Sequence, residues 1–205
     1  MTASTDFLRA FLRNPATTGA IAPSSERLAR VLASVVPVSG PGRAGRVTVV
    51  ELGPGTGAVS AVVARRLPPG ARHLAIELDP AMVAHLRRAH PDLEVVPGDA
   101  RRLPALLAEH GVQRADAVVC GLPWALFDDA TQAQVLDGIS TAIGPTGAFT
   151  TFAYLQGMAL PAARRFRATL RRRFEEVQVT ATVWRNLPPA FVYVCRRPAG
   201  VDGTG

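Results

Sequence analysis

Short apolar runs alternate with longer amphipathic stretches along most of this chain. The runs have the length of buried strands, whereas the stretches repeat their apolar positions at the spacing of a helix. Strands are predicted at residues 47–50, 73–77, 93–96, 115–120 and 148–155. Helices are predicted at residues 58–67, 80–90, 103–110, 161–173 and from Asp128 or Asp129 to 143. This alternation is typical of an α/β fold with a doubly wound, mostly parallel sheet.

The two ends of the chain depart from this alternation. Residues 5–13 predict an amphipathic helix, which either packs on the protein's own core or lies on a membrane surface. Its apolar face carries Phe7, Leu8, Phe11 and Leu12, and Arg9 and Arg13 lie off that face. A second helix is predicted from a cap at Ser24 or Ser25 to about residue 36. Residues 174–184 and 191–197 predict a final antiparallel hairpin, which completes a seven-stranded sheet, and residues 198–205 predict a disordered tail.

The first strand runs into a glycine-rich turn, in which Gly53, Gly55 and Gly57 precede a helix. Such a turn lets a ligand approach bare backbone at a helix N-terminus. It also fits the dinucleotide fingerprint, but Glu51 would then face a pyrophosphate, and like charges in a half-buried site repel each other. S-adenosylmethionine (SAM) carries an ammonium and a sulfonium and no phosphate, so it suits Glu51 better. The turn resembles motif I of the class I SAM-dependent methyltransferases.

Acidic residues follow the second and third strands at the carboxyl edge of the predicted sheet, where open parallel sheets bind ligands. Glu77 is placed to accept hydrogen bonds from ribose hydroxyls, which a nicotinamide cofactor also needs. Asp99 is placed to accept from the adenine amino group, and this favours SAM. Either acid alone could be a helix cap. The predicted cofactor-binding residues are Glu51, Gly53, Gly55, Thr56, Gly57, Glu77, Asp99, Ala100 and Cys120.

The fourth strand is followed by Gly121-Leu122-Pro123-Trp124. This position resembles the Asn/Asp-Pro-Pro-aromatic motif of amino-directed methyltransferases and the Asn-Leu-Pro-Tyr of ribosomal-RNA adenine dimethyltransferases. In those enzymes a backbone carbonyl and an amide oxygen accept hydrogen bonds from the amine. Gly121 replaces the Asn or Asp, so the carbonyls of Gly121 and Leu122 remain as acceptors, and Trp124 offers a face to a cation. The alternative for Trp124 is ordinary packing.

Composition narrows the chemistry further. The net charge is +7, and all 23 basic residues are arginines. The lack of lysine excludes a Walker-A lysine, a lysine Schiff base and a Ser–Lys pair. Two cysteines and four histidines lie at no ligand spacing, so we predict no metal site and take all four histidines as structural or surface residues. With no apolar run that approaches a membrane span and no signal-peptide core, we expect a cytoplasmic protein.

Several stretches together resemble the bacterial phospholipid N-methyltransferases, which methylate phosphatidylethanolamine. They are residues 11–15, 19–25, the glycine turn, GLPW and WRNLPPA at 184–190. The resemblance implies SAM as cofactor and phosphatidylethanolamine or its partly methylated forms as acceptor. It also implies acceptor binding by Trp184, Arg185 and Asn186, and peripheral association with the inner face of an anionic membrane. The implied domains are N-terminal helices at 1–37 and a methyltransferase domain at 38–197.

Other functions remain open at this point. The arginine content also suits a nucleic-acid methyltransferase, although few residues remain after Trp124 for a separate RNA-binding domain. A nicotinamide oxidoreductase fits the glycine turn but not Glu51 or Asp99. A noncatalytic SAM-binding protein and a methyltransferase for another amino lipid or a small amine are further alternatives. We expect a monomer.

Overall fold

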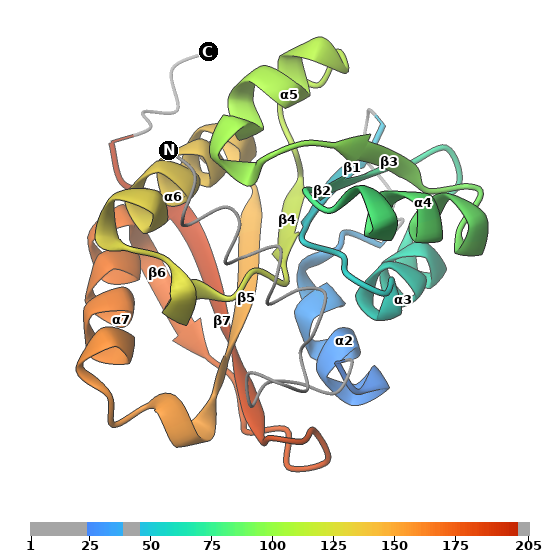
Figure 1. Ribbon diagram of the computed structural model, residues 1–205. Helices are drawn as coiled ribbons and strands as arrows, with labels where there is room; N and C mark the ends of the chain where they lie inside the picture. Colours follow the sequence, from blue (N-terminus) through green and yellow to red (C-terminus); the bar gives the residue numbers. More distant parts are fainter. Residues whose placement is uncertain (1–23, 39–45, 201–205) are drawn as a thin grey trace.

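The computed structural model describes residues 24–38 and 46–200. Within these residues, seven strands form one sheet in the order β3-β2-β1-β4-β5-β7-β6 (Figure 1). The strands are β1 (Thr48–Leu52), β2 (Arg72–Glu77), β3 (Glu94–Pro97), β4 (Ala117–Cys120), β5 (Ala148–Tyr154), β6 (Phe174–Val179) and β7 (Ala190–Pro198). β1 to β5 pair in parallel, and β7 runs antiparallel to both β5 and β6. The predicted fold class is confirmed.

Helices cover both faces of the sheet. They are α2 (Glu26–Leu32), α3 (Ala58–Arg66), α4 (Pro80–Ala89), α5 (Leu103–Glu109), α6 (Asp129–Ile143) and α7 (Pro161–Arg173). Leu28 and Leu32 of α2 pack with α3 and with Val49 of β1 in one apolar cluster. Leu103 of α5, Leu136 of α6 and Phe166 of α7 belong to a second cluster, which contains Val50 of β1. Because neighbouring residues of β1 enter different clusters, the strand is buried on both faces, as its continuous apolar run predicts.

Local sequence signals set where the helices begin. Ser25 rather than Ser24 caps α2, because its hydroxyl accepts from the Leu28 amide at 3.2 Å. The Asp79 carboxylate caps α4 at the Ala81 amide, ahead of a first-turn proline. Asp128 rather than Asp129 caps α6. The chain therefore enters each of these helices at a residue that satisfies a free amide of the first turn.

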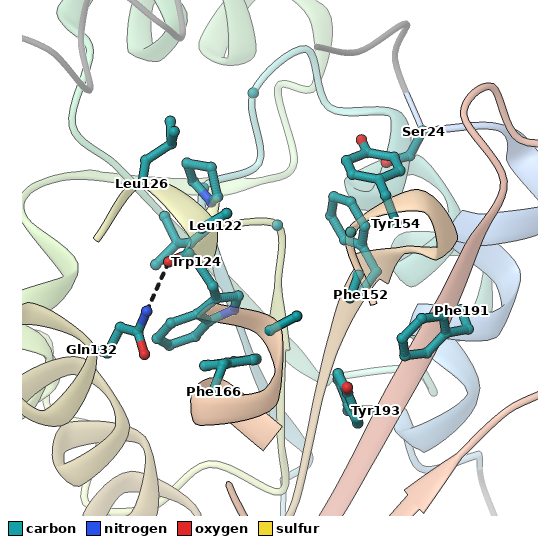
Figure 2. Close-up of a pocket in the computed structure, with 18 of the residues that line it drawn as sticks. Ser24, Leu122, Trp124, Leu126, Gln132, Phe152, Tyr154, Phe166, Phe191 and Tyr193 are labelled. Carbon is teal, nitrogen blue, oxygen red and sulfur yellow. Dashed lines mark hydrogen bonds between the residues drawn. The ribbon is translucent and has the colours of Figure 1, made fainter. Parts of the chain in front are cut away.

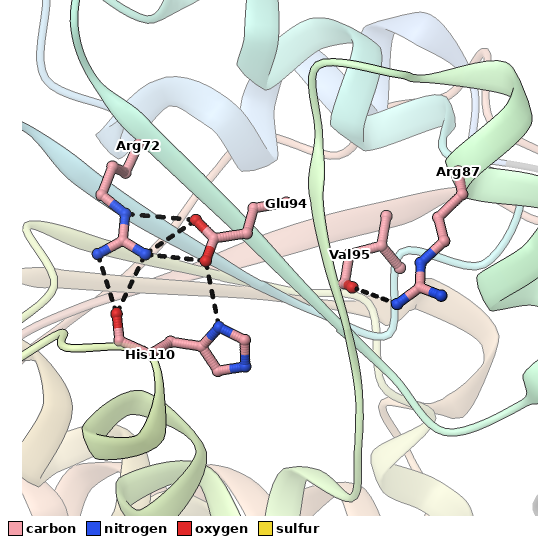
Figure 3. A network of polar contacts seen from close by, with 5 residues as sticks. All are labelled: Arg72, Arg87, Glu94, Val95 and His110. Carbon is pink, nitrogen blue, oxygen red and sulfur yellow. Dashed lines mark hydrogen bonds and ion pairs between the residues drawn. The ribbon is translucent and has the colours of Figure 1, made fainter.

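An ion-pair network joins β2, β3 and the end of α5 at the amino edge of the sheet (Figure 3). Nη2 of Arg72, the first residue of β2, lies 2.8 Å and 2.9 Å from the two carboxylate oxygens of Glu94, the first residue of β3. Arg72 also donates to the His110 carbonyl, and His110 Nδ1 lies 3.2 Å from Glu94. Glu94 is partly exposed, so solvent screens the pair and its stabilising effect is modest. The network lies at the opposite edge from the ligand-binding end of the strands.

The final hairpin is shorter than predicted. β6 ends at Val179, not at residue 184, and only an isolated bridge joins Val183 to Ala190. The Thr180 hydroxyl accepts a hydrogen bond from the Val192 amide at 3.0 Å. Between this pair and the Val183–Ala190 bridge, the first segment has two residues and β7 has one. The Val192 amide thus bonds to a side chain and not to a backbone carbonyl of the neighbouring strand, and the chain bulges away from β7. β7 also runs to Pro198, one residue beyond the predicted strand and into the predicted tail.

The predicted N-terminal helix at 5–13, with Phe7, Leu8, Arg9, Phe11, Leu12 and Arg13, lies outside the described residues, as do residues 201–205. In the part of the chain that the structure does describe, no helix has the length and apolar character needed to cross a bilayer.

Candidate active site

The turn after β1 holds three glycines in left-handed conformations, with φ of 66° at Gly53, 55° at Gly55 and 84° at Gly57. A Cβ on Gly53 would lie 2.8 Å from the side chain of Leu122, and one on Gly57 would lie 2.3 Å from that of His90. The left-handed backbone favours glycine at both positions, and an added Cβ would also force the Leu122 or His90 side chain to move. A Cβ on Gly55 would meet nothing within 4 Å. Gly55 is thus the residue at which the turn presents bare backbone to open space.

Glu77, at the end of β2, is tied to this turn. Its carboxylate is buried and accepts the Gly55 amide at 3.3 Å and the Asp79 amide at 2.9 Å. Burial raises the pKa of Glu77 above its usual range, although these backbone bonds oppose the shift. Each carboxylate oxygen can accept more than one hydrogen bond, so Glu77 keeps acceptor capacity for a ligand beside the turn.

Glu51 has a partner that the sequence did not reveal. Its Oε2 lies 3.0 Å from Nε2 of His73, and both side chains are buried. The register of β1 and β2 pairs Val49 with His73, so Glu51 and His73 project from the same face of the sheet. His73 is therefore structural, and it holds a carboxylate that also lines the cavity described below.

Asp99 and Ala100 follow β3 at the same edge. The Asp99 carboxylate caps the short helix η2 (Ala100–Arg102) by accepting the Arg101 amide and the Arg101 guanidinium, each at 2.9 Å. Burial raises the pKa of Asp99, but its bonds to Arg101 outweigh burial, and the net shift is downward. Asp99 is thus an ionised acceptor, and the helix-cap alternative also applies to it.

The loop after β4 packs directly on the glycine turn. A Cβ on Gly121 would lie 2.7 Å from the backbone oxygen of Gly53, so this contact excludes the Asn or Asp of the related motifs. The Leu122 carbonyl already accepts the Trp124 amide at 3.1 Å. Cys120, in contrast, is fully buried, and burial raises the pKa of its thiol to about 12. Cys120 does not line the cavity described below, and its predicted contact with the cofactor stays a prediction.

Trp124 is held from several sides. Its Nε1 donates to the Thr151 hydroxyl at 2.7 Å, and its ring stacks on Phe166 with centroids 4.8 Å apart. Gln132, from α6, donates to the Trp124 carbonyl at 2.9 Å and thereby fixes the turn. The indole is 5% exposed. Phe166 covers one face of the indole, so the prediction that Trp124 offers a face to a cation can apply only to the other face, and it stays a prediction.

A cavity of about 580 Å³ lies between these loops and the segments around β5 and α7. Its aromatic lining consists of Trp124, Phe152, Tyr154, Phe166, Phe191 and Tyr193. Figure 2 shows Trp124 and Phe166 on one side of the cavity, with Phe152 and Tyr154 across from them. Glu51, Gly53, Gly55, Thr56, Gly121, Leu122 and Trp124 line it, whereas Gly57, Glu77, Asp99, Ala100 and Cys120 do not.

Two buried polar atoms of the cavity-lining residues have no hydrogen-bond partner among the described residues. They are the Tyr154 hydroxyl and Nε of Arg167. Burial raises the pKa of Tyr154, so its hydroxyl stays protonated and can donate. The sequence reasoning did not single out Tyr154 or Gln132, and it did not place Arg167 in the cavity. The rule that ligands bind at the carboxyl ends of the strands was a usable signal for Tyr154, because Tyr154 ends β5.

Known proteins of similar sequence point to one class of enzyme. A methyltransferase-domain family model matches residues 49–147. An ornithine lipid N-methyltransferase of Singulisphaera acidiphila is 33% identical over 193 residues, which are 93% of this chain and 94% of the relative. The chain belongs to the class I methyltransferases.

Solved structures agree with this fold. The O-methyltransferase TomG of Streptomyces achromogenes, in complex with SAM, aligns with a TM-score of 0.62 at 18% identity over 96% of this chain and 91% of its own. Human methyltransferase-like protein 13, in complex with S-adenosylhomocysteine, aligns with a TM-score of 0.58 at 17% identity over 87% and 82% of the two chains. SAM is the cofactor of this methyltransferase, and the open backbone at Gly55 beside Glu77 fits it.

The loop between β6 and β7 corrects one of the predicted substrate contacts of this methyltransferase. Asn186 is 2% exposed, and its amide accepts the Ser25 amide at 2.9 Å and donates to the Pro188 carbonyl at 2.7 Å. Both ends of its side chain are therefore used within the protein, and Asn186 holds the loop on α2. Trp184 is 69% exposed and Arg185 is also exposed, and neither lines the cavity. Among the described residues, no group of three or more side chains could hold a metal ion.

Proposed function

We propose that this methyltransferase transfers methyl groups to the amine of an amino lipid at the inner face of the cytoplasmic membrane. The observation that carries the proposal is the cavity itself. Its wall at the glycine turn suits SAM, and the remaining walls are mostly aromatic and aliphatic. Such walls suit an acceptor whose reactive nitrogen is attached to a large apolar body. The similarity to an ornithine lipid N-methyltransferase supports the same conclusion.

The chain's own residues have distinct parts in the proposed reaction. The glycine turn, Glu51, Glu77 and Asp99 would hold SAM, which supplies an electrophilic methyl group on its sulfonium. The turn at Gly121 and Leu122 would hold the amine close to the methyl group, so that catalysis rests mainly on positioning. The apolar walls exclude water, and desolvation favours the neutral amine, which is the nucleophilic form. The proton lost from the amine passes to solvent.

Phosphatidylethanolamine and ornithine lipid both satisfy the proposal. Each combines a primary amine with an anionic group, a phosphate in one lipid and a carboxylate in the other. Nε of Arg167 in the cavity wall has no partner within residues 24–38 and 46–200, and it suits either anion because arginine forms charge-assisted bonds with both groups. The shared chemistry is thus a primary amine near an anion on an apolar anchor.

Labelled SAM tests the acceptor directly. The full chain is incubated with vesicles that contain phosphatidylethanolamine, with vesicles that contain ornithine lipid, with unstructured RNA and with ethanolamine. We expect label in a lipid fraction, and the two vesicle types identify the lipid. Label in RNA or ethanolamine without lipid label would refute the proposal.

Sedimentation of the same vesicles tests the predicted helix at residues 5–13. If that helix lies on the membrane, the vesicles should recover the full chain better than a chain without residues 1–13.

A further inference from the structure

Exposed apolar side chains gather at one end of the molecule. Within the described residues, four of the six large exposed hydrophobic side chains come from two loops, and we call these four the apolar rim. They are Met158, Leu160, Trp184 and Leu187. Trp184 and Leu187 are the most exposed, at 69% and 75%. Apolar residues exposed together at one place usually mark an interaction surface.

The two loops are neighbours, and the first of them lines the cavity. Tyr154, the last residue of β5, pairs with Ala190, the first residue of β7. The Leu155 amide then donates to the Pro189 carbonyl at 2.9 Å, which joins the segment after β5 to the segment before β7. Figure 1 shows both segments at the same end of the molecule. Met158 and Leu160 also line the cavity, so the apolar rim is continuous with the apolar cavity walls.

The protein holds Trp184 and Leu187 in their exposed positions. Asn186 lies between them in the chain, is buried, and bonds the loop to Ser25 and to Pro188. Val183, on the other side of Trp184, is buried and bridged to Ala190. The loop is thus fixed on both sides while its two largest apolar side chains point to solvent. A fixed loop of this kind presents them at little further cost in conformational entropy.

The charged residues around the apolar rim indicate which kind of partner would bind it. Residues 155–169 and 180–189 contain four arginines and no aspartate or glutamate. Arg185 lies beside Trp184, and Arg164 and Arg165 are exposed near the start of α7, close to Leu160 in the chain. Tryptophan and leucine beside arginine suit the interface of an anionic bilayer, where the ring occupies the headgroup level and the cation meets lipid phosphate.

We propose that the apolar rim is a membrane-docking surface that seats the mouth of the cavity on an anionic bilayer. This inference rests on the proposed function, because a lipid acceptor gives the cavity a reason to face the membrane. The headgroup amine then reaches the cavity while the acyl chains stay in the bilayer or follow the apolar wall. Docking through the rim does not depend on the predicted helix at residues 5–13.

The two tryptophans make the test specific, since Trp184 is exposed and Trp124 is buried. Vesicles of phosphatidylcholine and phosphatidylglycerol, without any amino lipid, are added to the full chain. We expect a blue shift of tryptophan emission and quenching by brominated lipid, and the W184F variant should lose both. The W184S/L187S variant should bind these vesicles at least about tenfold more weakly, since each buried apolar side chain favours partitioning. Its binding of S-adenosylhomocysteine should be unchanged.

The V38S variant is the matched control, because Val38 is 62% exposed and is not part of the rim. Equal weakening by V38S and W184S/L187S, or an absence of quenching, would overturn the proposal. So would a self-association in sedimentation velocity that W184S/L187S abolishes, because the rim would then bind a second copy. Methylation of lipid in detergent micelles is measured separately, because it does not require docking on a bilayer. If only the docking proposal is wrong, the lipid in micelles is still methylated. If the proposed acceptor is wrong, the lipid in micelles is not methylated, although the protein still binds vesicles.

Discussion

The two halves of the site differ in how their polar groups are satisfied. In the cofactor half, around β1 to β3, Glu77 accepts two backbone amides and Asp99 accepts Arg101, so both carboxylates are already held in place. In the acceptor half, around β5 and α7, the Tyr154 hydroxyl and Nε of Arg167 are buried without a partner among the described residues. The cofactor half is thus preorganised by the fold, whereas the acceptor half contains donors that a ligand would satisfy.

The halves meet where Gly121 packs on the backbone of Gly53. This contact fixes the distance between the glycine turn and the loop after β4, which we propose holds the acceptor. Neither partner can move away easily, because Gly53 donates to the Ile76 carbonyl and Gly121 to the Leu52 carbonyl. The spacing of the two halves therefore depends on the lack of a side chain at Gly121.

The largest effect is expected for Gly121→Ala. The added Cβ would lie 2.7 Å from a backbone oxygen, which cannot rotate away as a flexible side chain would, so the two loops must separate. We expect methyl transfer to fall by about a hundredfold or more, since a misplacement of about 1 Å has that cost. Stability should also fall, by about 1–3 kcal/mol, as in an overpacked core. Turnover and thermal unfolding measure the two effects.

Gly157→Ala is the stability control for Gly121→Ala. A Cβ on Gly157 meets nothing within 4 Å, and its φ does not require glycine. Its thermal unfolding should match that of the natural chain. If Gly121→Ala unfolds at the same temperature as Gly157→Ala and turns over normally, the two loops do not depend on this contact.

The same division explains what the sequence could predict. The cofactor half is encoded in short local stretches, because the glycine turn follows β1, Glu77 ends β2 and Asp99 lies two residues after β3. The acceptor half is assembled from β5, α6, α7 and β7, so no local motif brings Gln132 and Tyr154 together. The Glu51–His73 pair depends on strand register, which fixes faces only once the pairing is known. Asn186 was misassigned for a similar reason, because its partner Ser25 lies far away in sequence.

A smaller effect, confined to the cofactor half, is expected for Glu77→Ala. The change leaves the Gly55 and Asp79 amides without their acceptor and removes the predicted partner of the ribose. Each unpaired buried group costs about 1–3 kcal/mol, so SAM affinity should fall by about tenfold to a hundredfold. Glu77→Gln keeps one acceptor oxygen and should recover part of the loss. Calorimetric titration with S-adenosylhomocysteine measures both variants.

Glu94→Gln is the matched control for Glu77, because it changes a carboxylate that pairs at the opposite edge of the sheet. It should leave cofactor affinity unchanged. A fall in affinity for Glu94→Gln as large as that for Glu77→Ala would show that general loss of structure, not loss of contact with the cofactor, explains the result.

The smallest effect is expected in the acceptor half, for Tyr154→Phe. The Tyr154 hydroxyl is buried and has no partner in the part of the chain that the structure describes. Its removal should leave stability unchanged or raise it slightly, because an unpaired buried hydroxyl is costly. If this hydroxyl donates to the acceptor, kcat/KM for the lipid should fall by about threefold to tenfold, the loss of one neutral hydrogen bond. Cofactor affinity should stay the same, since Tyr154 lies across the cavity from Trp124 rather than beside Glu77. Lipid kinetics, thermal unfolding and calorimetry on the one variant separate these outcomes. Unchanged lipid kinetics would mean that Tyr154 only packs against Phe152, and that the acceptor half selects its substrate by shape alone.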